Sequence, residues 1–144
     1  MFNKILTVCI GNICRSPSAE KILQQLMPSK EVTSAGIGAL VDHEIEKNAA
    51  HLLTTNNYNS ENHKARQVSN DIISNAQLIL VMEKKHQQIL MQKYPSASGK
   101  IMLLGKWNSD EEIPDPYRKS TEAFEHAFTQ IEKNCKAWAE KLTR

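Results

Sequence analysis

Cysteine is scarce in this chain, and the three that occur are an odd number. A small, odd set of cysteines does not suit a disulfide framework and fits a reducing compartment, so we expect a cytoplasmic protein. Long apolar runs are also missing: the mean hydropathy is −0.48, and the apolar stretch near the N-terminus is too short for a signal peptide. We therefore expect no membrane insertion.

Neither sign of charge is in large excess. Lysine and arginine number 18 against 16 acidic residues, and the resulting net charge of +2 is too small to indicate a nucleic-acid partner. The five histidines have no metal-ligand spacing, so we interpret them as scattered polar or capping side chains and expect no metal or other cofactor. No repeat or linker divides the 144 residues, and we expect one domain over residues 1–144 and a monomer.

Short apolar segments alternate with amphipathic ones along the whole chain. This alternation predicts an α/β fold, with a mostly parallel sheet covered by helices on both faces and a ligand site outside the carboxyl ends of the strands. The expected strands are residues 5–8, 32–35, 78–82 and 101–104, and the expected helices are residues 19–27, 45–53, a short helix from 69, 83–94 and 124–142.

A cysteine-to-arginine segment follows the first expected strand. It reads Cys-Ile-Gly-Asn-Ile-Cys-Arg-Ser over residues 9–16. Glycine and asparagine tolerate unusual backbone angles, and Ser16-Pro17 can supply the N-cap and first-turn proline of the next helix. This order predicts a phosphate-binding loop, whose members are Cys9, Ile10, Gly11, Asn12, Ile13, Cys14, Arg15 and Ser16.

Such a loop can bind one anion and activate its first cysteine. Successive backbone N–H groups and the positive end of the helix dipole can face the anion, and the Arg15 guanidinium can bind two phosphate oxygens at once. The same positive surroundings stabilise a thiolate at Cys9, so we predict Cys9 as the nucleophile toward a bound phosphorus. The alternative is a small buried cysteine at the end of a strand and a solvated arginine.

Cleavage of an aryl phosphate also needs an acid, because no group in this loop can give a proton to the leaving oxygen. Asp115 lies between Pro114 and Pro116 in the long loop after the fourth expected strand, where the two prolines can restrict its pose. An ordinary Asp-Pro turn is the alternative, but a phosphate loop at the same edge of the sheet favours a general acid. The neighbouring Tyr117 can stack on a substrate ring, or it can be a buried tyrosine with a satisfied hydroxyl.

These motifs resemble those of the low-molecular-weight protein tyrosine phosphatases, whose signature is Cys-x5-Arg-Ser near the N-terminus and Asp-Pro-Tyr near the C-terminus. The resemblance covers essentially the whole chain and extends to Ser34-Ala35-Gly36 and Met82-Glu83-Lys84. The sequence is most similar to the bacterial, Wzb-type branch that is linked to exopolysaccharide and capsule synthesis. The family implies a four-stranded parallel sheet with helices on both faces, and no metal.

The resemblance implies a chemical role for each catalytic candidate. Cys9 would attack phosphorus and form phosphocysteine, while Arg15 and the loop amides hold the phosphoryl oxygens. Asp115 would protonate the leaving tyrosyl oxygen and then act as the base for the hydrolytic water. The implied substrate is a phosphotyrosine protein, the tyrosine-rich cytoplasmic tail of a membrane-bound kinase of capsule or exopolysaccharide synthesis.

The resemblance also implies supporting roles. Ser16 would stabilise the thiolate, and Asn12 would hold the loop through side-chain hydrogen bonds. Leu40 and Tyr117 would line the cleft. Eukaryotic members carry an aromatic residue where Leu40 stands and a second tyrosine where Arg118 stands, so regulation by a phosphorylated tyrosine pair is not expected here.

Other interpretations stay open at this point. Cys14 can form a reversible disulfide with Cys9, or it can be a buried thiol that packs under the loop. Arsenate reduction on the same fold needs a relay of cysteines, for which the candidate beyond Cys14 is Cys135, predicted to lie in the core. A phosphopeptide-binding module without turnover would be favoured if Asp115 were missing.

Overall fold

The computed structural model describes residues 2–143 and confirms the predicted parallel sheet. Four strands pair in the order β2-β1-β3-β4, and every pairing between them is parallel. The apolar segments make these strands because each is short and rich in β-branched residues. The strands are β1 (Lys4–Cys9), β2 (Glu31–Gly36), β3 (Leu78–Val81) and β4 (Ile101–Leu103).

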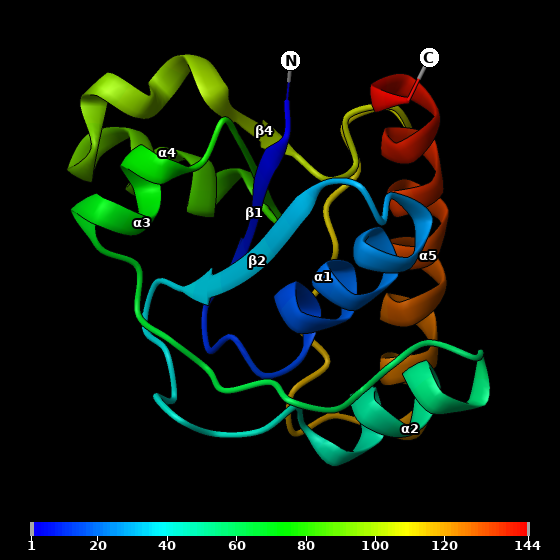
Figure 1. Ribbon diagram of the computed structural model, residues 1–144. Helices are drawn as coiled ribbons and strands as arrows, with labels where there is room; N and C mark the ends of the chain where they lie inside the picture. The colour runs from blue at the N-terminus through cyan, green and yellow to red at the C-terminus, as the bar shows by residue number, and fades with distance from the viewer. Residues whose placement is uncertain (1, 144) are drawn as a thin grey trace.

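Helices cover both faces of the sheet, as predicted. Figure 1 shows α1 and α5 together on one face and α3 and α4 on the other. The helices are α1 (Arg15–Leu26), α2 (Lys47–Thr55), α3 (Asn70–Asn75), α4 (Lys84–Lys93), the 3₁₀ helix η1 (Pro95–Lys100) and α5 (Thr121–Leu142). The 3₁₀ helix was not predicted; Pro95 ends α4 as expected, but it also opens this turn, because its fixed φ suits a first helical position. No helix within residues 2–143 is long and apolar enough to cross a membrane.

Alternate side chains of the central strand β1 belong to two hydrophobic cores. Ile5 packs with the core under α1 and α5, whereas Leu6 and Val8 pack with the core under α3 and α4. Each fully buried side chain of this size contributes roughly 1.5–3 kcal/mol. The strand is therefore fixed from both faces, and so is its carboxyl end, where Cys9 stands.

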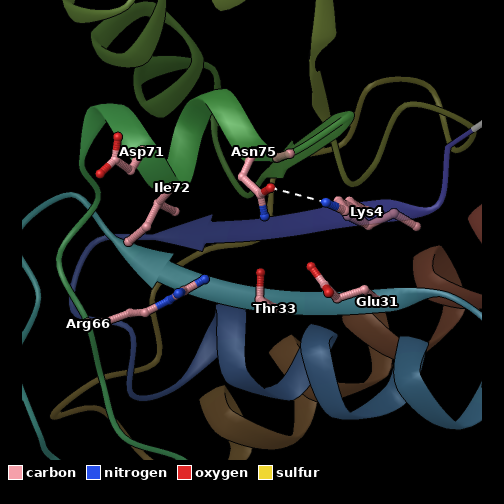
Figure 2. Close-up of a pocket in the computed structure, with 9 residues that line it drawn as sticks. Lys4, Glu31, Thr33, Arg66, Asp71, Ile72 and Asn75 are labelled. Atoms are coloured by element: carbon pink, nitrogen blue, oxygen red, sulfur yellow. Dashed lines mark hydrogen bonds between the residues drawn. The ribbon is translucent and has the colours of Figure 1, made fainter.

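A polar groove lies along one face of the sheet (Figure 2). Its volume is about 560 Å³, and it lies between α3 and the strands β1 and β2. Its lining includes side chains of both charge signs and no cysteine or histidine, so it is not the predicted site. Its polar lining residues are Lys4, Glu31, Thr33, Arg66, Asp71 and Asn75.

Candidate active site

The segment after β1 forms a cradle because its carbonyl groups are turned outward. Every carbonyl oxygen from Cys9 to Cys14 accepts a hydrogen bond from a group outside residues 9–14. In a planar trans peptide the N–H of the next residue points the opposite way, so the loop N–H groups are free to face a bound anion. For the carbonyls of residues 9 to 14 in turn, the donors are Ile37 N, Gly38 N, Leu40 N, His63 Nε2, Glu46 N and Ser18 N, at donor–acceptor distances of 2.7 to 3.2 Å.

The close approach of β2 to this loop requires a glycine. A Cβ atom at Gly36 would lie 2.4 Å from the carbonyl oxygen of Ile10, which is far inside van der Waals contact. Gly36 N–H instead donates to the carbonyl of Arg66. The end of β2 can therefore lie against the loop and supply the donors that follow it.

Asn12 is the residue that fixes the loop conformation. Its φ is 59°, in the left-handed region that asparagine tolerates, whereas Gly11 does not have a positive φ, so the strained position falls on Asn12. The side-chain Nδ2 donates to Ser16 Oγ and to Ser34 Oγ, both at 2.9 Å, and Oδ1 accepts from Arg66 N–H at 2.9 Å. These bonds tie the loop to α1, to β2 and to the segment before α3.

The Ser16 side chain contacts Cys9 and does not cap α1. Its Oγ is 2.9 Å from Cys9 Sγ, and its N–H points to the same sulfur at 3.4 Å, so two donors can face a thiolate. The predicted N-cap role of Ser16 is wrong: α1 begins at Arg15, Cys14 precedes it without a side-chain cap bond, and the Ser16 hydroxyl is engaged by Cys9 and Asn12.

Arg15 is held in one orientation by three contacts. It is 2 % exposed, and its Nη1 donates to Glu83 Oε2 at 2.6 Å and to the carbonyl of Ile113 at 2.7 Å. Its Nη2 is 3.7 Å from Asp115 Oδ2. Because Nη1 has only two N–H groups, both are used, and the Nε and Nη2 edge of the guanidinium is left for phosphoryl oxygens.

Glu83 is ionised at neutral pH. Burial opposes its ionisation, but the hydrogen bond and the charge of Arg15 hold its pKa below the ordinary value. A partly buried pair of this kind fixes geometry more than it adds stability, because desolvation offsets much of the attraction. Glu83 therefore positions the arginine.

The predicted site residues meet around one pocket of about 170 Å³. Asn12 and Ser16 do not line this pocket, because their side chains point behind the loop. Leu40 and Tyr117, 37 % and 36 % exposed, give the pocket two apolar walls. The lining residues are Cys9, Ile10, Gly11, Ile13, Cys14, Arg15, Gly38, Leu40, Asp115 and Tyr117.

Asp115 belongs to the same pocket as Cys9, although the two are far apart in the sequence. Its Oδ1 accepts the N–H of Tyr117 at 3.0 Å, and its side chain is 45 % exposed. The guanidinium carbon of Arg118 lies 5.3 Å from the centre of the Tyr117 ring, a cation–π contact on the side chain that forms the wall. The arrangement brings together a nucleophile, an anion cradle, a carboxyl group and an aromatic wall.

Several residues of the site were not predicted. The interpretation of the histidines as scattered polar residues needs correction at His63 and His86, which are 7 % and 0 % exposed, and His63 Nε2 donates to the carbonyl of Asn12 at 2.7 Å. The sequence points to Glu83 only through the segment Met82-Glu83-Lys84, which resembles the family pattern. The place of Glu83 two residues after the end of the buried strand β3, at the carboxyl edge of the sheet, is the signal that could have identified it.

The sequence model of the family described as "Low molecular weight phosphotyrosine protein phosphatase" matches residues 4–144. The chain is 49% identical over 142 residues to the low molecular weight protein-tyrosine-phosphatase Wzb of Salmonella typhimurium, covering 99% of this chain and 95% of that protein. The solved structure of Vibrio vulnificus Wzb in complex with benzylphosphonate is similar, with a TM-score of 0.95, 47% identity and coverage of 98% and 99% of the two chains. The YwlE arginine phosphatase from Geobacillus stearothermophilus has a TM-score of 0.91 and 31% identity, with coverage of 96% and 92%.

Proposed function

This chain belongs to the low molecular weight phosphotyrosine protein phosphatase family, and on that basis we propose that it hydrolyses protein phosphotyrosine through a phosphocysteine formed on Cys9. Residues 1–144 act as one phosphatase domain. The observation that carries the proposal is the single pocket that holds Cys9 and Arg15 together with the carboxyl of Asp115. Nucleophile, anion binder and acid are the three parts that this reaction needs.

In the first step the Cys9 thiolate attacks phosphorus as the bond from phosphorus to the tyrosyl oxygen breaks. The electron pair of that bond goes to the tyrosyl oxygen, which takes a proton from the Asp115 carboxyl. The loop N–H groups and the free edge of Arg15 bind the three phosphoryl oxygens, over which negative charge is spread in the transition state. Their geometry is set in advance by Glu83 and the outward carbonyls, so little reorganisation is needed during the reaction.

In the second step the Asp115 carboxylate takes a proton from water, and the water oxygen attacks the phosphorus of phosphocysteine. The phosphorus–sulfur bond breaks and Cys9 leaves as a thiolate. The Ser16 hydroxyl and N–H, both directed at the sulfur, stabilise this leaving group. Inorganic phosphate is then released.

We expect Tyr117→Ala to lower kcat/KM on phosphotyrosine peptides roughly ten-fold, because burial of the substrate ring against this wall contributes about 1–2 kcal/mol. Inhibition by inorganic phosphate, which has no ring, should change little. The Vibrio vulnificus relative was solved with benzylphosphonate, a phosphonate attached to a benzyl group, and this supports a ring-binding wall. Steady-state kinetics on paired phosphotyrosine and phosphoserine peptides is the measurement.

Trp107→Ala is the control, since that aromatic is 41 % exposed but lies outside the pocket. A Tyr117→Ala variant with the wild-type kcat/KM on both peptides would rule out a role for Tyr117 in binding the substrate ring. Turnover of the phosphoserine peptide as fast as that of the phosphotyrosine peptide would rule out selection of aryl phosphates. Phosphoarginine belongs in the same assay, because one relative is named as an arginine phosphatase. Preference for phosphoarginine over phosphotyrosine would reassign the substrate.

The proposed physiological substrate is the tyrosine-rich cytoplasmic tail of a membrane-bound kinase of capsule or exopolysaccharide synthesis, with the enzyme acting as a cytoplasmic monomer. Support comes from the resemblance to the Wzb-type branch and from relatives that carry that name. An Asp115→Asn variant should retain the phosphorylated tail and be released from it by phosphate. Retention of the unphosphorylated tail to the same extent would contradict a substrate relationship.

Arsenate reduction is not favoured. Cys135, the cysteine that a relay would need beyond Cys14, is 0 % exposed, and burial raises its pKa. Its Sγ faces the carbonyl of Ala19 inside the core. A thiol in this position cannot exchange disulfides with a partner at the surface. A phosphopeptide-binding module without turnover is not favoured either, because it would not need the acid Asp115.

Peroxide should inactivate the enzyme reversibly, with a disulfide formed between Cys9 and Cys14 and activity restored by dithiothreitol. Burial and the neighbouring Cys9 raise the pKa of Cys14, so we expect the disulfide to close slowly and to close faster as the pH rises. Peptide mapping after oxidation and recovery assays are the measurements. Cys14→Ser should recover less activity than the wild type, whereas the control Cys135→Ser should recover as much activity as the wild type. Full recovery of Cys14→Ser would disprove the protective role.

A further inference from the structure

His86, in the first turn of α4, is a buried side chain without an assigned role. It is 0 % exposed, and neither ring nitrogen has a hydrogen-bond partner among residues 2–143. Buried polar atoms are nearly always paired, so this ring calls for an explanation. Burial, together with the charge of Arg15, lowers its pKa to about 4, and the ring therefore carries a single N–H donor at neutral pH.

The ring lies behind the ion pair that positions the arginine. His86 Nε2 is 3.5 Å from Glu83 Oε2, the same oxygen that accepts Arg15 Nη1 at 2.6 Å. The other oxygen, Oε1, faces Lys85 Nζ at 3.6 Å, and that lysine side chain is 66 % exposed. The charged groups around the ring are thus Arg15, Glu83, Lys85 and, more weakly, Asp115.

We propose that His86 is a positioning residue that holds Glu83 by a hydrogen bond when a phosphoryl group engages Arg15. The inference rests on the proposed function, because it needs phosphoryl oxygens at the guanidinium. A bound dianion attracts the guanidinium and weakens its bond to Glu83 Oε2. His86 Nε2–H, already close to that oxygen, then donates to it, so the half-buried carboxylate keeps this oxygen paired while the arginine binds substrate.

Two substitutions separate this role from simple packing. His86→Leu removes the donor, and we expect it to raise the inhibition constant of inorganic phosphate and the KM for an aryl phosphate roughly three- to ten-fold, with a smaller change in kcat. His86→Gln keeps an N–H donor and should restore most of the loss. His51→Leu, at an exposed histidine of α2, is the matched control and should change neither constant. A loss of stability in His86→Leu with an unchanged phosphate constant would overturn the proposal.

A double-mutant cycle tests whether His86 acts through Glu83. In a Glu83→Gln background, His86→Leu should add little to the loss of phosphate affinity, because the carboxylate that His86 holds is no longer present. Losses that multiply independently would show that His86 acts elsewhere and would overturn the proposal.

The wild-type protein supplies a direct readout, for which a variant is needed only as a control. In ¹H–¹⁵N spectra of the histidine rings, the His86 Nε2–H resonance should move downfield as phosphate saturates the site, and the Glu83→Gln variant should not show the shift. A His86 resonance that stays in place at saturation overturns the inference while leaving the proposed function intact. Failure of the wild type to bind phosphate or hydrolyse aryl phosphates would instead overturn the proposed function itself.

Discussion

Replacing Cys9 with serine is expected to lower phosphotyrosine turnover by about 10⁴-fold or more. The serine hydroxyl is scarcely ionised where a thiolate forms, so the attacking group is lost. The cradle is left intact, because its outward carbonyls, Asn12 and Arg15 do not depend on the sulfur. The variant should therefore keep its fold and bind inorganic phosphate about as well as the wild type.

Three measurements check this result together: turnover on a phosphotyrosine peptide, phosphate binding by calorimetry and the midpoint of urea unfolding. Cys135→Ser is the control, since that cysteine lies in the core away from the pocket and should keep its activity. Appreciable turnover by Cys9→Ser would contradict a covalent mechanism. Loss of phosphate binding would mean that the sulfur also shapes the cradle.

Replacing Asp115 with asparagine is expected to lower kcat on phosphotyrosine roughly 100- to 10,000-fold, the usual range for a lost general acid. The amide keeps the size of the side chain and can still accept the Tyr117 N–H, so the loop geometry should persist. The loss should shrink as the leaving group becomes more acidic, because such groups depart without a proton. A series of substituted aryl phosphates measures this dependence.

Asp110→Asn is a matched control for the acid. Asp110 lies in the same long loop and is exposed, and its φ of 56° suits asparagine. This variant should behave as the wild type across the leaving-group series. An equal loss at every leaving group in Asp115→Asn would show that Asp115 orients the substrate and does not donate a proton.

Local features of the fold could be predicted from the sequence because they depend on short segments. The four strands are short apolar runs, and the loop after β1 is specified by consecutive residue types whose backbone preferences and chemistry agree. Asp115 could be proposed as a candidate because its flanking prolines make a short segment unusual. In each case the informative residues are neighbours in the chain.

The features that were missed depend on contacts between distant segments. Arg15 is oriented by Glu83 and by the carbonyl of Ile113, which are 68 and 98 positions away in the sequence. No local sequence pattern predicts either contact. His63 reaches the carbonyl of Asn12 from a loop 51 positions away. The N-cap prediction for Ser16 is wrong because it uses only the local Ser-Pro pattern. The contact of Ser16 Oγ with the sulfur of Cys9 depends on the conformation of the whole loop between the two residues.

Detection of the covalent intermediate tests the central claim most directly. The Asp115→Asn variant is mixed with the phosphate ester of an acidic phenol, whose departure needs no proton from Asp115, whereas hydrolysis of phosphocysteine still lacks its base. The mixture is quenched in acid within milliseconds to seconds and digested for mass spectrometry. We predict one phosphoryl group on the sulfur of Cys9, appearing with the burst of released aryl alcohol and absent from a Cys9→Ala variant. Turnover by the wild type under the same conditions, with no phosphoryl group on Cys9 at any quench time, would contradict the account.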